Sequence, residues 1–320
     1  MALCETGTRA LLGAVFGPTG EGEPGYARRL LHLLDAGMLL LIDRGFTGDE
    51  FLNEVAGTGA QLLARSTQRR RPAVMAVLPD GSYLTRLLGR TFRIIEADVT
   101  VECADGRRIG DRYRLITTLL DHRTDPAARL IGLYHERWEI EVSFLALKDT
   151  LFAGRVLRSA EPAGLEQELW ALLSIYQTLR RIMVEAVESL PGADPDRASF
   201  TVALHTATEQ VVTAQGVLGP TDRLGAIGRA VLDNLLPARR ARTSARKVKC
   251  PMSQYSGKLS EPRPAASQPI TLTTITVRPR PAPDQQPLHE QALGFRERTL
   301  RLLRTDPSRA WRTVEIRRAL

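Results

Sequence analysis

Several residue types are scarce in this chain of 320 residues. It has only three cysteines, Cys4, Cys103 and Cys250, and they lack the spacing of a metal site or of a disulfide framework. No apolar run approaches the roughly 18 residues of a membrane span, and the first residues lack the basic-then-apolar pattern of a signal peptide. We therefore expect a cytoplasmic protein without membrane contact, in which the cysteines are structural.

Lysine is the other scarce residue. The chain has 44 basic residues, and only Lys148, Lys247, Lys249 and Lys258 among them are lysines. The net charge of +8 favours a polyanionic partner, although many basic proteins bind none. With 43% hydrophobic residues, a chain of this length can bury a sizeable core in one or two domains.

One of the rare lysines belongs to a polar stripe near the middle of the chain. Tyr134, Arg137, Glu141 and Lys148 fall within an arc of roughly 60° if the segment is a helix with about 100° per residue. A carboxylate can ligate a hard cation, while guanidinium and ammonium groups can hold phosphate oxygens. The alternative is a solvated face of an ordinary amphipathic helix.

A second informative segment is an uninterrupted apolar run, Met38–Ile42, that ends in Asp43. This pattern predicts a buried strand of a mostly parallel sheet with an acid at its carboxyl end. Active sites of open α/β sheets gather at that end of the strands. The alternative is that Asp43 merely caps the following turn or helix.

These two segments together resemble the signature of transposases of the insertion-sequence-4 family. The spacing Tyr-x2-Arg-x3-Glu-x6-Lys, preceded by a strand that ends in Asp-Arg-Gly-Phe, matches at every gap, and the likeness covers roughly residues 1–215. The family consists of DDE enzymes on a ribonuclease H-like core. The resemblance therefore implies an α/β fold with DNA transposition as its function.

The resemblance also implies roles for individual residues. Asp43 would be the second catalytic Asp and Glu141 the catalytic Glu, and both would be ligands of Mg²⁺ or Mn²⁺, with two ions in the complete site. Tyr134, Arg137 and Lys148 would contact double-stranded DNA, at the transposon ends and in the target. A homodimer in the DNA complex is implied, at the bacterial nucleoid.

Enzymes of this family cut through a hairpin intermediate in which a flipped base stacks on an aromatic side chain. The expected tryptophan is absent from the relevant region, which leaves Tyr83, Phe92 and Tyr113 as alternatives.

The chain departs from the family pattern in one respect. No acid before Asp43 stands in for the first catalytic Asp, which the family carries on its first core strand. We therefore expect an amino-terminally truncated chain that lacks this strand and a metal ligand and that does not cut DNA by itself.

The sequence also divides visibly along its length. Strand and helix patterns alternate at first and give way to β-like runs separated by Asp80-Gly81 and Asp105-Gly106, which are hairpin signals. Pro126 opens the signature helix, with Asp125 as a plausible cap. We predict these parts: residues 1–66, first part of the core; 67–121, an all-β insertion between the second Asp and the Glu; 122–236, the helical remainder of the core; 237–289, a basic, proline-rich, disordered tail; and 290–320, a terminal helical segment.

Three functions remain open from the sequence. The first is a DDE transposase impaired by loss of its first Asp, and the second is a catalytically inactive DNA-binding remnant of such an enzyme. The third is a different ribonuclease H-like nuclease, in which Tyr134 and Lys148 have no role. The basic run Arg239–Lys249 either contacts phosphate or serves as a plain linker.

Overall fold

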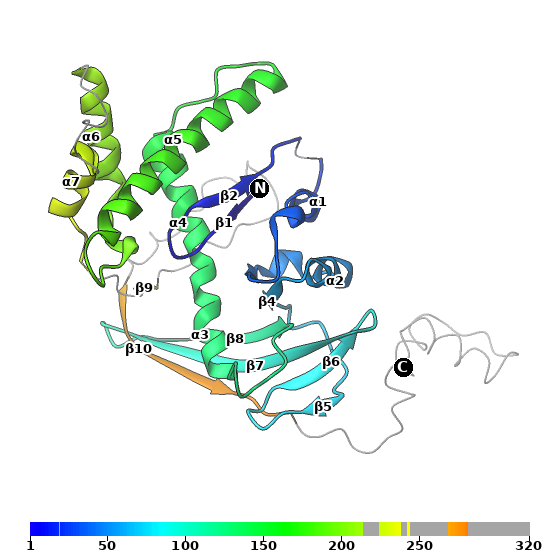
Figure 1. Ribbon diagram of the computed structural model, residues 1–320. Coiled ribbons are helices and arrows are strands. Elements are labelled where there is room, and N and C mark those ends of the chain that lie inside the picture. The colour runs from blue at the N-terminus through cyan, green and yellow to red at the C-terminus, as the bar shows by residue number, and fades with distance from the viewer. Residues whose placement is uncertain (19, 214–223, 238–241, 244–267, 281–320) are drawn as a thin grey trace, which may run out of the picture.

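The computed structural model describes residues 1–18, 20–213, 224–237, 242–243 and 268–280. Figure 1 shows a β-sheet at the base of the molecule, a group of helices at the opposite end, and one continuous helical segment that leads from the sheet to that group. The predicted terminal helix at residues 290–320 and most of the basic run lie outside the described residues. No described helix is long and apolar enough to cross a membrane.

The main sheet has eight strands in the order β3-β4-β8-β7-β10-β9, with β5 and β6 pairing beside β7. Only β3 and β4 are parallel; the other strand pairs in the described part of the chain are antiparallel. The prediction of a mostly parallel sheet is therefore wrong. The strands are β3 (Leu39–Ile42), β4 (Gln61–Arg65), β5 (Ala76–Val77), β6 (Tyr83–Leu87), β7 (Arg90–Cys103), β8 (Arg108–Thr117), β9 (Arg242–Thr243) and β10 (Gln268–Val277).

The two Asp-Gly pairs lie in hairpin turns as predicted. Gly81 between β5 and β6 has φ +83°, and Gly106 between β7 and β8 has φ +80°, a backbone region that glycine enters at little cost. The strands between residues 67 and 121 do not form a sheet of their own, because β8 pairs with β4 from Leu63↔Thr117 onward. One sheet thus links the strand before Asp43 to these hairpins.

The tail, for which the sequence predicts disorder, contains a strand. β10 pairs antiparallel with β7 from Ile270↔Cys103 to Val277↔Ala97. Just after it, Arg278 forms an ion pair with Asp98, and Arg280 forms one with Glu96 at 3.1 Å. Residues 268–280 therefore belong to the folded core, and the predicted boundary at residue 237 is wrong for this part.

Helices cover both faces of the main sheet, and the alternation of β4 side chains explains why. Leu62 packs with Phe51 and Leu52 of α2 in one buried cluster, whereas Leu63 packs with Leu130 and other side chains of α3 in another. The helices and short helical turns are α1 (Glu23–Arg28), η1 (Leu31–Leu33), η2 (Arg44–Phe46), α2 (Asp49–Gly57), α3 (Ala127–Tyr134), η3 (His135–Trp138), α4 (Glu139–Leu145), η4 (Ala146–Leu151), α5 (Pro162–Glu188), η5 (Pro195–Arg197), α6 (Phe200–Val212) and α7 (Gly225–Asp233).

The first residues form a separate two-stranded sheet, in which β1 (Ala2–Cys4) pairs antiparallel with β2 (Leu11–Ala14). A third apolar cluster, at the far end, joins α5, α6 and α7 through Met183, Ala203 and Val231. Figure 1 shows the hairpin beside α4, between the main sheet and these helices.

The signature segment is continuous but is not one regular helix. It runs as an α-helix in α3, a 3₁₀ turn in η3, an α-helix in α4 and a π turn in η4. Asp125 does not cap it, because Pro126 takes the cap position and makes no side-chain hydrogen bond. Instead, Asp80 of the β5–β6 turn accepts a hydrogen bond from the Ala127 amide at 3.0 Å.

Candidate active site

Asp43 lies where the sequence predicted, directly after the carboxyl end of β3. One oxygen of its carboxylate accepts a hydrogen bond from the Arg44 amide at 2.8 Å, so the residue does cap the following 3₁₀ turn. The side chain nevertheless keeps 49% of its surface exposed. Because one hydrogen bond uses only part of the carboxylate's acceptor capacity, the remaining lone pairs are available to a ligand.

Tyr134, which we predicted to contact a DNA phosphate, is buried rather than on the surface. The residue is 3% exposed, and its hydroxyl donates to the Ile42 carbonyl at 3.2 Å. Burial raises the pKa of the phenol to about 12. Tyr134 therefore ties the signature segment to the last residue of β3, immediately before Asp43.

Arg137 makes the second link between the same two elements. Its Nη1 lies 3.9 Å from Asp43 Oδ2, and its side chain is 14% exposed. Residues i and i+3 eclipse in a 3₁₀ turn, and the guanidinium accordingly lies over the Tyr134 ring, with Cζ 5.8 Å from the centroid. Its buried Nε has no hydrogen-bond partner in the described residues. The tight turn therefore aims Arg137 at the carboxyl end of β3.

Glu141 and Lys148 are both exposed on the same segment. Glu141 lies in α4, about one turn beyond Arg137, so the two side chains share a side of the segment. Lys148 lies in the π turn, and its Nζ is 5.3 Å from the centre of the Phe144 ring. The structure therefore brings Tyr134 to Ile42 and Arg137 to Asp43, and it leaves Glu141 and Lys148 exposed.

The donor chemistry at this edge suits a hard divalent cation, because Asp43 and Glu141 offer accessible carboxylate oxygens. Within the described ranges, no group of three or more His, Cys, Asp or Glu side chains could hold a metal ion. Asp43 and Glu141 therefore fit such a cation by ligand type.

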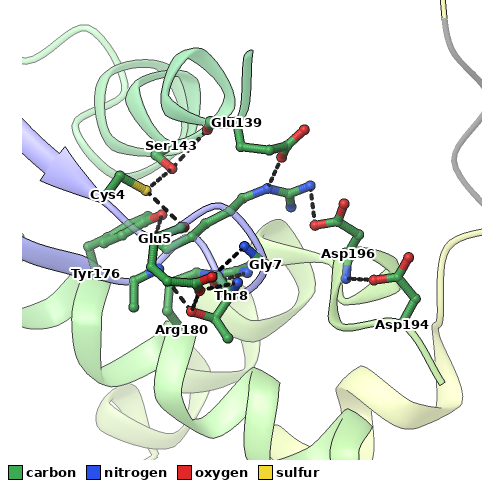
Figure 2. Close-up of polar contacts among 12 residues, drawn as sticks. Cys4, Glu5, Gly7, Thr8, Glu139, Ser143, Tyr176, Arg180, Asp194 and Asp196 are labelled. Atoms are coloured by element: carbon green, nitrogen blue, oxygen red, sulfur yellow. Dashed lines mark hydrogen bonds and ion pairs between the residues drawn. The ribbon is translucent and has the colours of Figure 1, made fainter. Parts of the chain in front are cut away.

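Sequence reasoning missed a buried ionic network behind the signature helix (Figure 2). Arg9, in the turn between β1 and β2, pairs with Glu139 at 2.5 Å and with Asp196 at 2.5 Å. Glu139 is buried and lies two residues before Glu141 in α4. The network therefore attaches the amino-terminal turn to the helix that carries the predicted catalytic Glu.

Helix α5 holds the same turn from the other side. Tyr176 donates its hydroxyl to the Arg9 carbonyl at 2.9 Å, and Arg180 Nε donates to the Thr8 carbonyl at 2.9 Å. Cys4 Sγ also lies 3.4 Å from Ser143 Oγ of α4, as Figure 2 shows. The sequence separations exceed 100 residues, so no local pattern announces these contacts.

The three aromatic alternatives for base stacking differ in accessibility. Tyr83 and Phe92 are fully buried in the cluster beneath α2. Tyr113 of β8 is partly exposed, and Arg65 stacks on it with Cζ 4.1 Å from the ring centre. Only Tyr113 of the three offers an accessible ring surface.

Comparison with known proteins agrees with the resemblance found in the sequence. A family described as "Transposase DDE domain" matches residues 1–177. The chain is also similar to transposase InsG for insertion sequence element IS4 of Escherichia coli (strain K12), with 28% identity over 258 residues. That match covers 77% of this chain and 58% of the relative, so the chain spans little more than half of the relative's length.

Proposed function

This chain belongs to the DDE transposase family, of the type of insertion sequence IS4, and we propose that it acts on the ends of such an element through the carboxyl edge of β3. The observation that carries the proposal is the pair of links between that edge and the signature segment. Tyr134 bonds to Ile42, and Arg137 lies beside Asp43. A solvated surface helix would not need either contact.

Asp43 and Glu141 would hold the divalent ion, Mg²⁺ or Mn²⁺, and the complete family site would hold two. When bound, such ions activate a water or a 3′-hydroxyl and stabilise the leaving oxygen of a DNA strand. The protein's own part is positional. Tyr134 fixes the segment against β3, and Arg137 balances the charge of Asp43.

Double-stranded DNA is the proposed partner. Arg137 and Lys148 would hold backbone phosphates of the transposon end, since guanidinium and ammonium groups bind phosphate oxygens strongly. Tyr134 has its hydroxyl engaged with Ile42 and is assigned to support rather than to DNA contact. Tyr113 is the candidate for stacking a flipped base. A homodimer on DNA, in the cytoplasm at the nucleoid, completes the proposal.

We further propose that the 320-residue chain binds DNA but does not cut it. Two carboxylates would leave one of two cations weakly held, because Mg²⁺ keeps its waters unless several ligands position it. In the described residues, β3 pairs only with β4, so its other edge is open to a further strand. The second candidate function, a DNA-binding remnant, follows from the same reasoning.

The test is a strand-cleavage assay with Mg²⁺ or Mn²⁺ on candidate end sequences. It compares this chain and a version extended upstream to restore the first Asp, each with and without Asp43→Ala. We expect cleavage by the extended version alone. Cleavage by the 320-residue chain that Asp43→Ala abolishes would overturn the proposed inactivity and support the site. Cleavage that survives Asp43→Ala in the extended version would refute the site itself.

A further inference from the structure

A second basic element lies at the same edge of the sheet as Asp43. Strands β3 and β4 are parallel, with Ile42 opposite Ala64. Parallel strands end at the same edge, so the loop after β4 emerges beside the loop that begins with Asp43. The loop after β4 contains three consecutive arginines, Arg69, Arg70 and Arg71.

A buried arginine forms hydrogen bonds with the backbone of this loop. Arg114 of β8 is 6% exposed and pairs with Glu96 at 2.8 Å. Its Nη1 donates to the carbonyl oxygens of Thr67 at 3.3 Å and Gln68 at 3.1 Å, and also to that of Arg70. A single guanidinium thus fixes three carbonyls, which gives the loop a defined shape.

The middle arginine turns inward and joins the two loops. Arg70 Nη2 donates to the Thr47 carbonyl at 2.9 Å and pairs with the Asp49 carboxylate. Thr47 lies in the loop after β3 that begins with Asp43, and Asp49 is the first residue of α2. Arg70 is therefore occupied, and its contacts hold the arginine loop against the candidate site.

The flanking arginines differ from Arg70 in their surroundings. Arg69 and Arg71 are exposed, and neither makes a side-chain hydrogen bond or ion pair with a described residue. Exposed arginines at the β7–β8 turn behave differently, because Arg107 pairs with Asp105 and Arg108 pairs with Glu102. Two uncompensated guanidiniums on a braced loop create a positive potential beside the Asp43 edge.

We propose that Arg69 and Arg71 form a phosphate-binding element that holds the DNA backbone beside the candidate active site. The proposal rests on the proposed DNA-binding function and deepens it, since these residues lie outside the signature segment. Guanidinium forks bind phosphate oxygens in bidentate fashion, and a loop held in one shape loses little entropy on binding. Arg69 and Arg71 would contact phosphates, while Arg70 and Arg114 position them.

The test measures the salt dependence of binding to a duplex of arbitrary sequence by fluorescence anisotropy, between 50 and 200 mM salt. Each lost phosphate contact lowers the log–log slope by about 0.9, so Arg69→Ala with Arg71→Ala should lower it by about 1.8. The factor by which affinity falls between 50 and 200 mM salt should therefore be about 12 times smaller for the double variant than for the unsubstituted chain. The double substitution to lysine should keep most of the slope.

The matched control is Arg107→Ala with Arg108→Ala, which removes the same charge from exposed but paired positions. We expect its slope to stay close to that of the unsubstituted chain. Equal slopes for the test and control variants, with the unsubstituted chain binding DNA, would overturn this proposal alone. Failure of the unsubstituted chain to bind any duplex would overturn the proposed function, and this inference with it.

Discussion

Replacing Arg93 by Met should destabilise the protein strongly, because this arginine joins three parts of the fold. Arg93 is fully buried in β7. Its Nε donates to Ser82 Oγ at 2.8 Å, its Nη1 donates to the carbonyls of Leu119 and Asp125, and its Nη2 pairs with Asp80. Asp80 in turn holds the first amide of α3, so the guanidinium supports the start of the signature segment.

The expected loss is about 3–5 kcal/mol in the free energy of unfolding. Removing one partner of a buried ion pair has this effect, since the remaining charge stays in a poorly solvated place. Met fills similar volume and is tolerated in cores, so a cavity adds little. The total stability of a typical protein is about 5–15 kcal/mol, so the variant should lose about a fifth of it or more.

Urea unfolding followed by circular dichroism measures the effect, and the matched control is Arg86→Met. Arg86 lies on β6 next to β7 but is exposed, and its Nε donates only to the Gly89 carbonyl at 3.1 Å. Exposed substitutions of this kind change stability by about 0.5 kcal/mol or less. If Arg93→Met and Arg86→Met shifted the unfolding free energy equally, the argument that Arg93 joins these elements would be refuted.

Three further predictions concern the candidate site and its support. Arg137→Ala should lower the log–log salt slope of DNA binding by about 0.9, and an unchanged slope would show that this guanidinium does not touch phosphate. Tyr134→Phe should lower the free energy of unfolding in urea by about 1 kcal/mol, because the hydrogen bond to the Ile42 carbonyl is lost. The salt slope of DNA binding should not change, and a lower slope would show that the Tyr134 hydroxyl contacts DNA. Burial works to raise the pKa of Asp80, but hydrogen bonds from Ser82 and Ala127 and the charge of Arg93 outweigh it and hold the pKa below the usual 3.8. Its contribution to the free energy of unfolding is therefore complete above pH 3.8 and is lost as the pH falls through the lower pKa of the folded state. Asp80→Asn should make the free energy of unfolding, measured with urea, fall less steeply with decreasing pH in this acid range. An unchanged pH dependence would contradict this prediction.

The sequence carried enough information to predict the local features of the site. An apolar run that stops at an acid predicted β3 with Asp43 at its end, and the Asp-Gly pairs predicted two hairpin turns. Both depend on neighbouring residues alone. The direction in which strands pair depends on residues that are distant in sequence. The prediction of a mostly parallel sheet is wrong for this reason, since β8 pairs antiparallel with β4.

Helical phase explains why Tyr134 is buried rather than on an accessible face. A regular helix would place Tyr134 and Glu141 on one accessible face, but the 3₁₀ turn of η3 and the π turn of η4 change the rotation per residue along the segment. Where a helix changes its winding depends on tertiary contacts, here with β3. The burial of arginines such as Arg9 and Arg114 was equally difficult to predict from the sequence. Their partners are distant in sequence, or have charged side chains of the kind that usually lie on the surface.

The strand in the tail had a local signal that composition obscured. Residues 270–277 are rich in Ile, Thr and Val, which favour strands. The surrounding prolines and serines favoured disorder instead. The difference matters for experiments, because a chain ending near Pro237 loses β10 together with the basic run. A truncation that tests the tail for phosphate contact must keep residues 268–280.

The late position of β10 also has a consequence for the order of folding. Arg278 and its partner Asp98 are 180 residues apart, so the outer edge of β7 cannot be covered until most of the chain has been synthesised. At about 5–20 residues per second, that edge stays open on the ribosome for roughly 9 to 36 s. An uncovered edge strand is a template for pairing with other chains. Nascent chains of this protein should therefore depend on chaperones during that interval, and the dependence should end when β10 emerges.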